Sequence, residues 1–327
     1  MTSVDPYMID PALLASHWAG DRMPLAFVEV DQLADDFGEL HLPPFPIIGV
    51  GDPLHPRSRH FDTIVEAPAT AERIVEQATC HPYAAAASVQ LLRCTEGMDA
   101  RAALTLESIT YAMLQGSVEH TDWIVAQPRT DPAPPGRIVL NRDDTCLRIV
   151  IDRPGARNAV DRALRDALFE AFTIAALDPD IARVELRSVG LAFSVGADLA
   201  EFGTTRDPAT AHAIRAVTLP AHPLSRCGPI VDMHVQGACI GSALEMAAFA
   251  GRITAAPSAW FQLPELAMGI LPGAGGCVSI PRRIGRQRTA LMILSGKRID
   301  AATALRWGLV DAIVDAPAVD PGGLHSD

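Results

Sequence analysis

The chain has 327 residues, of which 49% are hydrophobic and 20% are charged, and its formal net charge is −12 at pH 7. This length and balance predict a globular protein with one large domain or two ordinary ones. The acidic balance argues against a nucleic-acid-binding protein, because such proteins need a basic face to displace the counterions of the phosphates.

The six cysteines are scattered, with no C-x-x-C pair and no cysteine or histidine spacing typical of zinc. We therefore expect reduced thiols, no metal and a cytoplasmic protein. The N-terminus lacks a basic stretch followed by an apolar run, so no signal peptide is predicted. No apolar run reaches about 18 residues, so we expect no membrane span.

The N-terminal part contains five candidate elements: short strands at 24–30 and 45–50, a helix at 69–79, an apolar run at 84–93 that fits a helix or a strand, and a helix at 100–120. Pro68 before the first helix and His81-Pro82 after it fit its two ends. The last helix is predicted from apolar residues that recur at three- and four-residue steps: Leu104, Ile109, Met113, Leu114 and Val118.

Residues 128–136 are rich in proline and glycine, which is typical of a linker. We place a boundary there, between a largely helical N-terminal extension (1–136) and a second part (137–315), followed by a tail (316–327). The second part predicts a hairpin at 138–151, a helix at 161–177 capped by Asp161, strands at 184–189, 230–235 and 253–255, and helices at 209–217, 242–250, 286–294 and 301–307. This alternation predicts an α/β fold.

Two turns of the second part have the residues needed to bind an oxyanion. Gly196 follows a predicted strand and permits a bend that aims the Ala197 N–H outward, although a plain loop would fit the same residues. The second turn, Gly241-Ser242-Ala243, opens an apolar helix, whose first N–H groups have no partner inside the helix. Two such donors converging on one carbonyl oxygen would form an oxyanion hole.

Two glutamates accompany these turns. Glu245 lies in the apolar run 243–249, where a buried carboxylate is costly unless it is paired. Glu265 follows a proline and precedes the glycine-rich turn at 269–276; alone, it would be taken as an exposed loop acid. Two carboxylates in one pocket push their pKa values apart, which gives one acid and one base.

The segments that carry these residues resemble the crotonase superfamily, also called the enoyl-CoA hydratase/isomerase family, from about Arg153 to Val314. The motifs are RPGARNA at 153–159, FSVGADL at 193–199, VQGACIGSALEMAAFAGRITA at 235–255, PELAMGILPGAGG at 264–276 and LSGKRIDAATALRWGLVDAIV at 294–314. The resemblance implies a core of ββα units wound as a spiral, an acyl-CoA thioester as ligand with no further cofactor, and a homotrimer or hexamer.

The resemblance also implies the roles of the site residues. The N–H groups of Ala197 and Ser242 would polarise the thioester carbonyl. Glu245 would activate a water that adds across the 2,3 double bond, and Glu265 would donate a proton to C2. The substrate-binding residues implied by the same motifs are Arg153, Ala156, Arg157, Asn158, Asp198, Leu199, Gly241 and Gly273.

The chain departs from the family pattern in three places. Ser242 and Ala243 replace glycines, and Ala200 stands where a lysine is frequent. Family members also continue past the equivalent of Val314 with helices that cover the ligand or dock on a neighbour, whereas this chain carries about 135 residues in front. We hypothesise that the helix at 100–120 replaces those helices as a lid or a trimer contact.

Other functions stay open at this point: a double-bond isomerase, a member resembling the cofactor-free oxygenases, and a non-catalytic binding or scaffold subunit. A nucleophile–base site is a further possibility, with a base from His212, His222 or His234 and a nucleophile from Ser194 or Ser225. The sequence contains no G-x-S-x-G motif to support it. His234 is predicted to be a core or edge histidine. The arginines at 282–288 predict a solvated face or, alternatively, a contact to the phosphates of coenzyme A.

Overall fold

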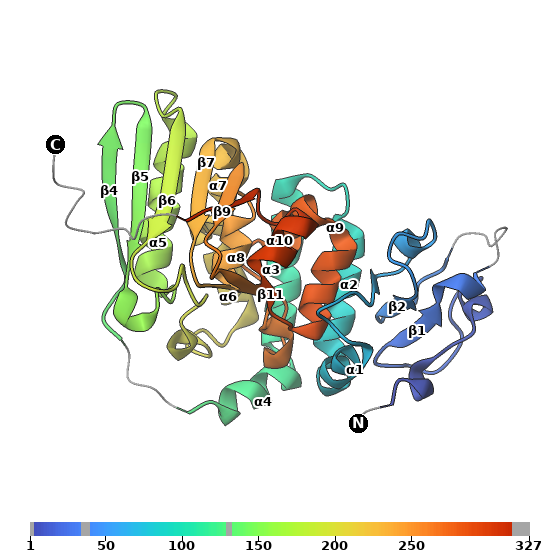
Figure 1. Cartoon of the computed structure of the whole chain (residues 1–327). Coiled ribbons are helices and arrows are strands. Elements are labelled where there is room, and N and C mark those ends of the chain that lie inside the picture. The colour runs from blue at the N-terminus through green and yellow to red at the C-terminus, as the bar shows by residue number, and fades with distance from the viewer. Residues whose placement is uncertain (1–2, 34–39, 129–132, 316–327) are drawn as a thin grey trace.

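The computed structural model describes residues 3–33, 40–128 and 133–315. Its largest sheet has the strand order β12-β9-β7-β6-β5-β4, with only the β4–β5 pair antiparallel (Figure 1). The strands are β4 (Arg137–Asp143), β5 (Cys146–Asp152), β6 (Arg183–Ser188), β7 (Val231–Val235), β9 (Arg252–Ala255) and β12 (Ala312–Ile313). The predicted hairpin and the three predicted strands are all in this sheet.

A second sheet has the order β11-β10-β8 and consists of β8 (Ala238–Ile240), β10 (Trp260–Gln262) and β11 (Ile299–Asp300). The chain passes from the large sheet to the small one twice, from β7 to β8 and from β9 to β10. A helix follows each passage: α8 (Ser242–Ala247) and then α9 (Gly276–Ser295). This repetition of strand, strand and helix confirms the predicted α/β fold class with its ββα units.

The other α-helices of the second part pack on strands or on other helices. They are α5 (Arg162–Leu177), α6 (Pro208–Thr218), α7 (Ala221–Cys227) and α10 (Ala301–Trp307). Asp161 caps α5 as predicted, since its side chain accepts the N–H of Leu164. The helix predicted at 286–294 is the second half of α9, which bends at Gly285, where φ is 80°.

Among its described residues, the N-terminal part contains a parallel sheet and four α-helices. They are β1 (Ala26–Glu29), β2 (Ile47–Val50), β3 (Thr63–Ile64), α1 (Ala71–Cys80), α2 (Pro82–Thr95), α3 (Ala100–Gln115) and α4 (Val118–Ala126). The small sheet lies at the edge of the molecule, whereas α1, α2 and α3 pack against α9 (Figure 1). The apolar run at 84–93 is therefore helical.

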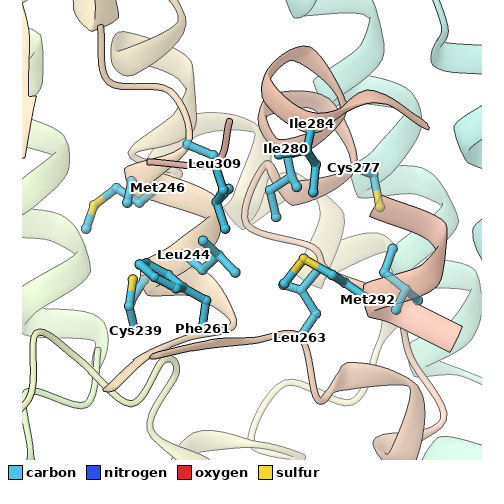
Figure 2. Packing of buried hydrophobic residues seen from close by; sticks show 14 of the residues in the cluster. Cys239, Leu244, Met246, Phe261, Leu263, Cys277, Ile280, Ile284, Met292 and Leu309 are labelled. Atoms are coloured by element: carbon cyan, nitrogen blue, oxygen red, sulfur yellow. The ribbon is translucent and has the colours of Figure 1, made fainter. Parts of the chain in front are cut away.

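The two parts share one hydrophobic core. Ile74 and Leu92 from the N-terminal helices belong to the same buried cluster as Leu244 and Met292 from the second part. Figure 2 shows side chains from α8, β10 and α9 meeting in this core. The boundary near residue 136 stays a prediction; residues 129–132 of the proposed linker and the tail 316–327 lie outside the described residues.

The single helix predicted at 100–120 is wrong, because two helices occupy this stretch. α3 ends at Gln115, and α4 begins after Ser117, whose side chain accepts the N–H of His120 and caps the new helix. The predicted face is also partly wrong: Ile109, Met113 and Val118 are exposed. Instead, α3 buries a stripe that includes the polar residues Glu107 and Ser108, because this face lies against α6 and α9.

Of the arginines at 282–288, only Arg282 is exposed as predicted, whereas the other three are half-buried and bonded to acids. Arg286 bonds Asp62, and Arg288 makes two hydrogen bonds to Glu66, at 3.0 and 3.2 Å. These partners come from the N-terminal part, so the cluster joins that part to α9. The sequence suggested an exposed cluster because the acidic partners of Arg286 and Arg288 lie more than 200 residues away in the chain.

Asp62 is the centre of the polar contacts between the two parts. It is 1% exposed, and its carboxylate accepts hydrogen bonds from Arg93 Nε at 2.7 Å and from the backbone N–H of Ile47 at 2.9 Å. Arg286 Nη1 lies 3.4 Å from the same carboxylate. One acid thus holds α2, α9 and the small sheet together.

Replacing Asp62 by alanine is expected to lower the free energy of unfolding by about 3 kcal/mol, because two half-buried arginines lose the buried carboxylate that they bind. Urea unfolding followed by circular dichroism measures this loss. The matched control is Glu76→Ala, which removes an exposed pair with Arg73 and should change stability by less than about 1 kcal/mol. Equal losses in the two variants would contradict the central role of Asp62.

Candidate active site

A cavity of about 910 Å³ lies where the N-terminal helices meet the two sheets. This volume is within the range of ligand pockets, about 300–1,000 Å³. Its wall includes residues of α3, α6 and α8 and the loops around 155–161, 195–205 and 262–274. Every short motif that suggested an enzyme therefore contributes to the wall of one cavity.

The two predicted turns lie against each other in this wall. The Ile240 N–H donates to the Ser194 carbonyl at 3.1 Å, which joins the strand of one turn to the strand of the other. Gly196 has a φ of +86°, and a Cβ added there would lie 2.7 Å from the Ile240 carbonyl oxygen and 3.6 Å from the Ser242 nitrogen. Only glycine permits this approach of the two backbones.

The N–H groups of Ala197 and Ser242 are both without an acceptor among the residues that the structure describes. Ser242 is the first residue of α8, and Gly241 before it provides no side-chain cap. The Ser242 hydroxyl is likewise buried with no hydrogen-bond partner in this part of the chain. Two unoccupied amide donors in one cavity wall are suited to an oxygen that gains negative charge.

Glu245 lies one turn along α8 from Ser242 and is 2% exposed. Its Oε2 accepts the N–H of Ala274 at 2.6 Å and the N–H of Gly276 at 2.8 Å. Burial raises the pKa of Glu245 to about 7, while the two backbone hydrogen bonds oppose the rise by favouring the charged form. Near neutral pH this group can therefore accept a proton.

Glu265 begins a short turn of 3-10 helix, Glu265–Met268, and is 8% exposed. Its Oε2 is buried without a hydrogen-bond partner among the described residues. Burial first, and then the charge of Glu245, raise the pKa of Glu265 well above its usual value. A hydrogen bond from its own backbone N–H opposes this rise, but Glu265 has no counterpart to the two N–H groups of Ala274 and Gly276 that bind Glu245. Glu265 is therefore the member of the pair that retains its proton.

A third buried acid, Glu107 of α3, was not identified from the sequence. Its two oxygens accept the N–H of Gly275 at 2.7 Å and the N–H of Cys277 at 2.8 Å. Burial and the charge of Glu245 raise the pKa of Glu107. The sequence did contain a signal, because Glu107 lies three residues after Leu104 and so faces the same way on the helix.

The N-terminal helices form part of the cavity wall. Tyr111 and Gln115 of α3 line it, and a Cβ added to Gly273 would lie 2.0 Å from the Tyr111 ring. On α4, His120 meets the ring of Phe202, another residue of the wall. The lid, the trimer contact and the oligomeric state stay predictions.

Most of the predicted site residues line this cavity. They are Glu245, Glu265, Ala197, Ser242, Ala156, Arg157, Asp198, Leu199, Gly241 and Gly273. Residues that the sequence did not identify as part of the wall include Glu201, Phe202 and Arg215. They were missed because they lie on elements whose packing no local motif specifies.

Arg153 and Asn158 were predicted to bind the substrate, but neither lines the cavity and both are buried. Arg153 donates to Asp198 at 2.7 Å and to the Ala159 carbonyl at 2.8 Å. Asn158 accepts the Arg153 N–H and donates to two backbone carbonyls of the loop after β6. These side chains hold the loops beside the site. The arginines at 282–288 are also absent from the wall.

The histidines form no nucleophile–base site with the serines considered. His234 is 9% exposed and its Nδ1 contacts the Thr254 hydroxyl at 2.9 Å, which confirms the prediction of a core histidine. Ser194 accepts the Gly196 N–H through its hydroxyl. Within residues 3–33, 40–128 and 133–315, no group of three or more metal-ligating side chains could hold an ion, and no helix has the length and hydropathy to cross a membrane.

Comparison with known proteins places these motifs in context. Residues 141–320 match the family model described as enoyl-CoA hydratase/isomerase. An enoyl-CoA hydratase of Mycobacterium tuberculosis is 33% identical over 190 residues, covering 55% of this chain and 69% of that protein. A 2,3-dehydroadipyl-CoA hydratase of Escherichia coli is 32% identical over 176 residues, covering 54% of this chain and 68% of that protein.

Solved structures agree with the sequence matches. The crystal structure of an enoyl-CoA hydratase/isomerase from Mycobacterium abscessus is 33% identical, with a TM-score of 0.51, and covers 55% of this chain and 71% of that chain. An enoyl-CoA hydratase from Bacillus anthracis is 28% identical, with a TM-score of 0.50, and covers 54% of this chain and 69% of that chain. The family model leaves residues 1–140, which include Glu107 and Tyr111, outside its match.

The raised pKa of Glu265 makes stability depend on pH. A buried carboxyl whose folded-state pKa is raised contributes stability that is fully present below the unfolded-state pKa and is lost as pH rises toward the folded-state pKa. Between these two pKa values, each such group lowers the free energy of unfolding by about 1.4 kcal/mol per pH unit. Glu265→Gln is therefore expected to weaken the loss of stability as pH rises above the usual pKa of a glutamate. Urea unfolding at several pH values measures the slope, and the exposed Glu72→Gln should leave it unchanged.

Glu107→Gln tests the contact between α3 and α9. The amide nitrogen of glutamine cannot accept, so one of the buried N–H groups of Gly275 and Cys277 loses its partner. We expect a loss of about 1–3 kcal/mol in the free energy of unfolding at pH 7. The matched control is Glu119→Gln, because Glu119 also accepts two backbone N–H groups, at the more exposed start of α2. A loss no larger than in this control would contradict the role of Glu107.

Proposed function

The chain belongs to the enoyl-CoA hydratase/isomerase family, as its motifs predicted, and on this premise we propose that it adds water across the 2,3 double bond of an enoyl-CoA thioester. One observation carries the proposal: two amide donors without acceptors share a cavity with two buried glutamates in different environments. The proposal needs no group beyond the coenzyme A portion of the substrate.

The thioester carbonyl oxygen would accept the N–H groups of Ala197 and Ser242. These donors polarise the carbonyl and stabilise the negative charge that forms on its oxygen when C3 is attacked. They lie in a backbone held by Gly196 and by the start of α8, so little reorganisation is needed as the charge develops. Loss of one such donor costs about 3–4 kcal/mol of transition-state stabilisation in enzymes of this kind.

The two glutamates would move the protons. Glu245, as carboxylate, takes a proton from water while the water oxygen bonds to C3 and the double-bond electrons pass to the carbonyl oxygen. The enolate then collapses, and C2 takes the proton of Glu265. The product gains one water molecule, and the pair is left with its proton exchanged from Glu265 to Glu245. The hydrogen bonds of Glu245 and the lack of one on Glu265 Oε2 support this division.

The coenzyme A portion would lie against arginines of the cavity. Its wall carries the arginines Arg157, Arg162, Arg165 and Arg298. The Arg298 guanidinium stacks 3.9 Å from the ring centre of Trp260, so its position is defined before any ligand binds. Arginine pairs well with phosphate because its planar N–H groups match phosphate oxygens. These cations would compensate for Ala200, which stands where family members often have lysine.

Glu245→Gln and Glu265→Gln are each expected to lower kcat for crotonyl-CoA about 100- to 10,000-fold, the usual contribution of a positioned acid or base. Binding of a saturated acyl-CoA should change little, because neither substitution alters the amide donors. Stopped-flow loss of the enoyl absorbance measures the first quantity and calorimetry measures the second. The exposed Glu170→Gln serves as the control, with unchanged kcat.

The competing functions are separated by offering crotonyl-CoA, a 3-enoyl-CoA and an arylacetyl-CoA side by side while oxygen uptake is followed. Hydration of crotonyl-CoA alone supports the proposal. Faster migration of the double bond would favour the isomerase, and oxygen consumption would favour the oxygenase. Binding without turnover, unaffected by Glu265→Gln, would identify a non-catalytic member and overturn the proposal.

A further inference from the structure

One cation in the cavity wall has no anionic partner. Arg215 of α6 donates through Nε to the Ser108 hydroxyl at 3.1 Å, through Nη2 to the Ser108 carbonyl at 3.0 Å and through Nη1 to the Gln115 side chain at 2.7 Å. All three acceptors are neutral. Among the described residues, no carboxylate lies within ion-pair distance of this guanidinium.

The nearby acid is already engaged elsewhere. Glu107 influences Arg215 electrostatically, yet its two oxygens accept the N–H groups of Gly275 and Cys277. The Tyr111 ring lies 4.5 Å from Arg215 Cζ, a cation–π contact that attracts the charge without neutralising it. Burial lowers the pKa of Arg215, which reflects the cost of keeping a charged group away from water.

Arg215 is held in a fixed orientation. Because the Ser108 hydroxyl oxygen accepts Nε–H, its own hydrogen is available to His212 Nδ1 at 2.9 Å. Together with Gln115, this chain of hydrogen bonds defines the plane of the guanidinium. Three of its five N–H groups are used in these contacts, so two remain for a ligand. Two N–H groups of one arginine are the usual partners of a carboxylate.

The position of Arg215 relative to the acids matters for the substrate. Glu245 accepts the Ala274 N–H, Gly273 packs on the Tyr111 ring, and that ring contacts Arg215. With the thioester carbonyl at the amide donors, C2 and C3 of an enoyl group lie at the glutamates. The carbons beyond C3 would then pass Gly273 and Tyr111 toward Arg215, between the apolar side chains of Ile214, Leu219 and Met246.

We infer that the acyl group carries a carboxylate at its far end and that Arg215 binds it. This inference rests on the proposed function and names its substrate class: an enoyl-CoA derived from a dicarboxylic acid. The Tyr111 hydroxyl, which has no hydrogen-bond partner among the described residues, is a second donor in the same wall. A plain fatty acyl chain would instead leave the guanidinium covered by hydrocarbon with no counterion.

The test compares pairs of 2-enoyl-CoA thioesters of four, six and eight carbons that end in a carboxylate or in a methyl group. At the length that reaches Arg215, the enzyme is expected to prefer the carboxylate in kcat/KM. Arg215→Met should lower the ratio of the two kcat/KM values about 10- to 100-fold, the effect of losing a charged hydrogen-bonded pair. Arg215→Lys should retain part of the preference.

The ratio separates recognition from folding, since both thioesters meet the same fraction of folded enzyme. Arg298→Met is the matched control. It should lower kcat/KM equally for both thioesters and leave their ratio unchanged. Tyr111→Phe, which removes only the hydroxyl, should lower the ratio several-fold. A preference for the methyl-terminated thioester at every length, or an unchanged ratio in Arg215→Met, would overturn the inference.

A separate measurement keeps the two proposals apart. If no thioester is hydrated, the proposed function fails, and calorimetry with saturated acyl-CoA thioesters that end in a carboxylate or a methyl group still tests Arg215. Tighter binding of the carboxylate form that disappears in Arg215→Met would support the inference without turnover. Equal binding of the two forms to the unaltered enzyme would refute it.

Discussion

Four successive backbone N–H groups at the start of α9, from residues 274 to 277, are all bonded to two buried carboxylates. Glu245 takes two of them and Glu107 takes the other two, and these acids come from different parts of the chain. Helix N-termini attract negative charge, so one helix end positions both acids. The location of Glu245, the packing of Tyr111 on Gly273 and the shape of the cavity therefore depend on α3 being docked.

The sequence predicted correctly those features of the site that depend on residues close together in the chain. Gly196 predicted a bend, and the small residues after Gly241 predicted an accessible helix start; the two turns do lie in one wall. Glu245 was expected in an apolar helix and is buried there. The strands and helices of the second part were predicted from the pattern of apolar and polar residues and from capping residues. Asp161, for example, caps α5 as predicted. In these cases the deciding interactions are local, within a few residues along the chain.

The rest depended on contacts that no local pattern specifies. Glu107 and Arg215 are separated by more than a hundred residues in sequence, and their significance comes only from how α3 packs against α6 and α9. Arg286 looked solvated because its partner Asp62 lies far away in the chain. Arg153 carried a family motif, yet it binds Asp198 inside the protein. Motif residues thus indicate where a site is, but not which of their side chains face the ligand.

The separation of Glu107 from its partner has a consequence during synthesis. Gly275 follows Glu107 by 168 residues, so α3 leaves the ribosome well before the backbone that satisfies its acid. At about 5–20 residues per second, that interval lasts roughly 8–34 s. Over this time α2 is already available to pack on α3, but the Glu107 carboxyl lacks the two backbone N–H groups that it binds in the folded protein. A nascent chain of this design would therefore benefit from a chaperone that shields α3 until α9 arrives.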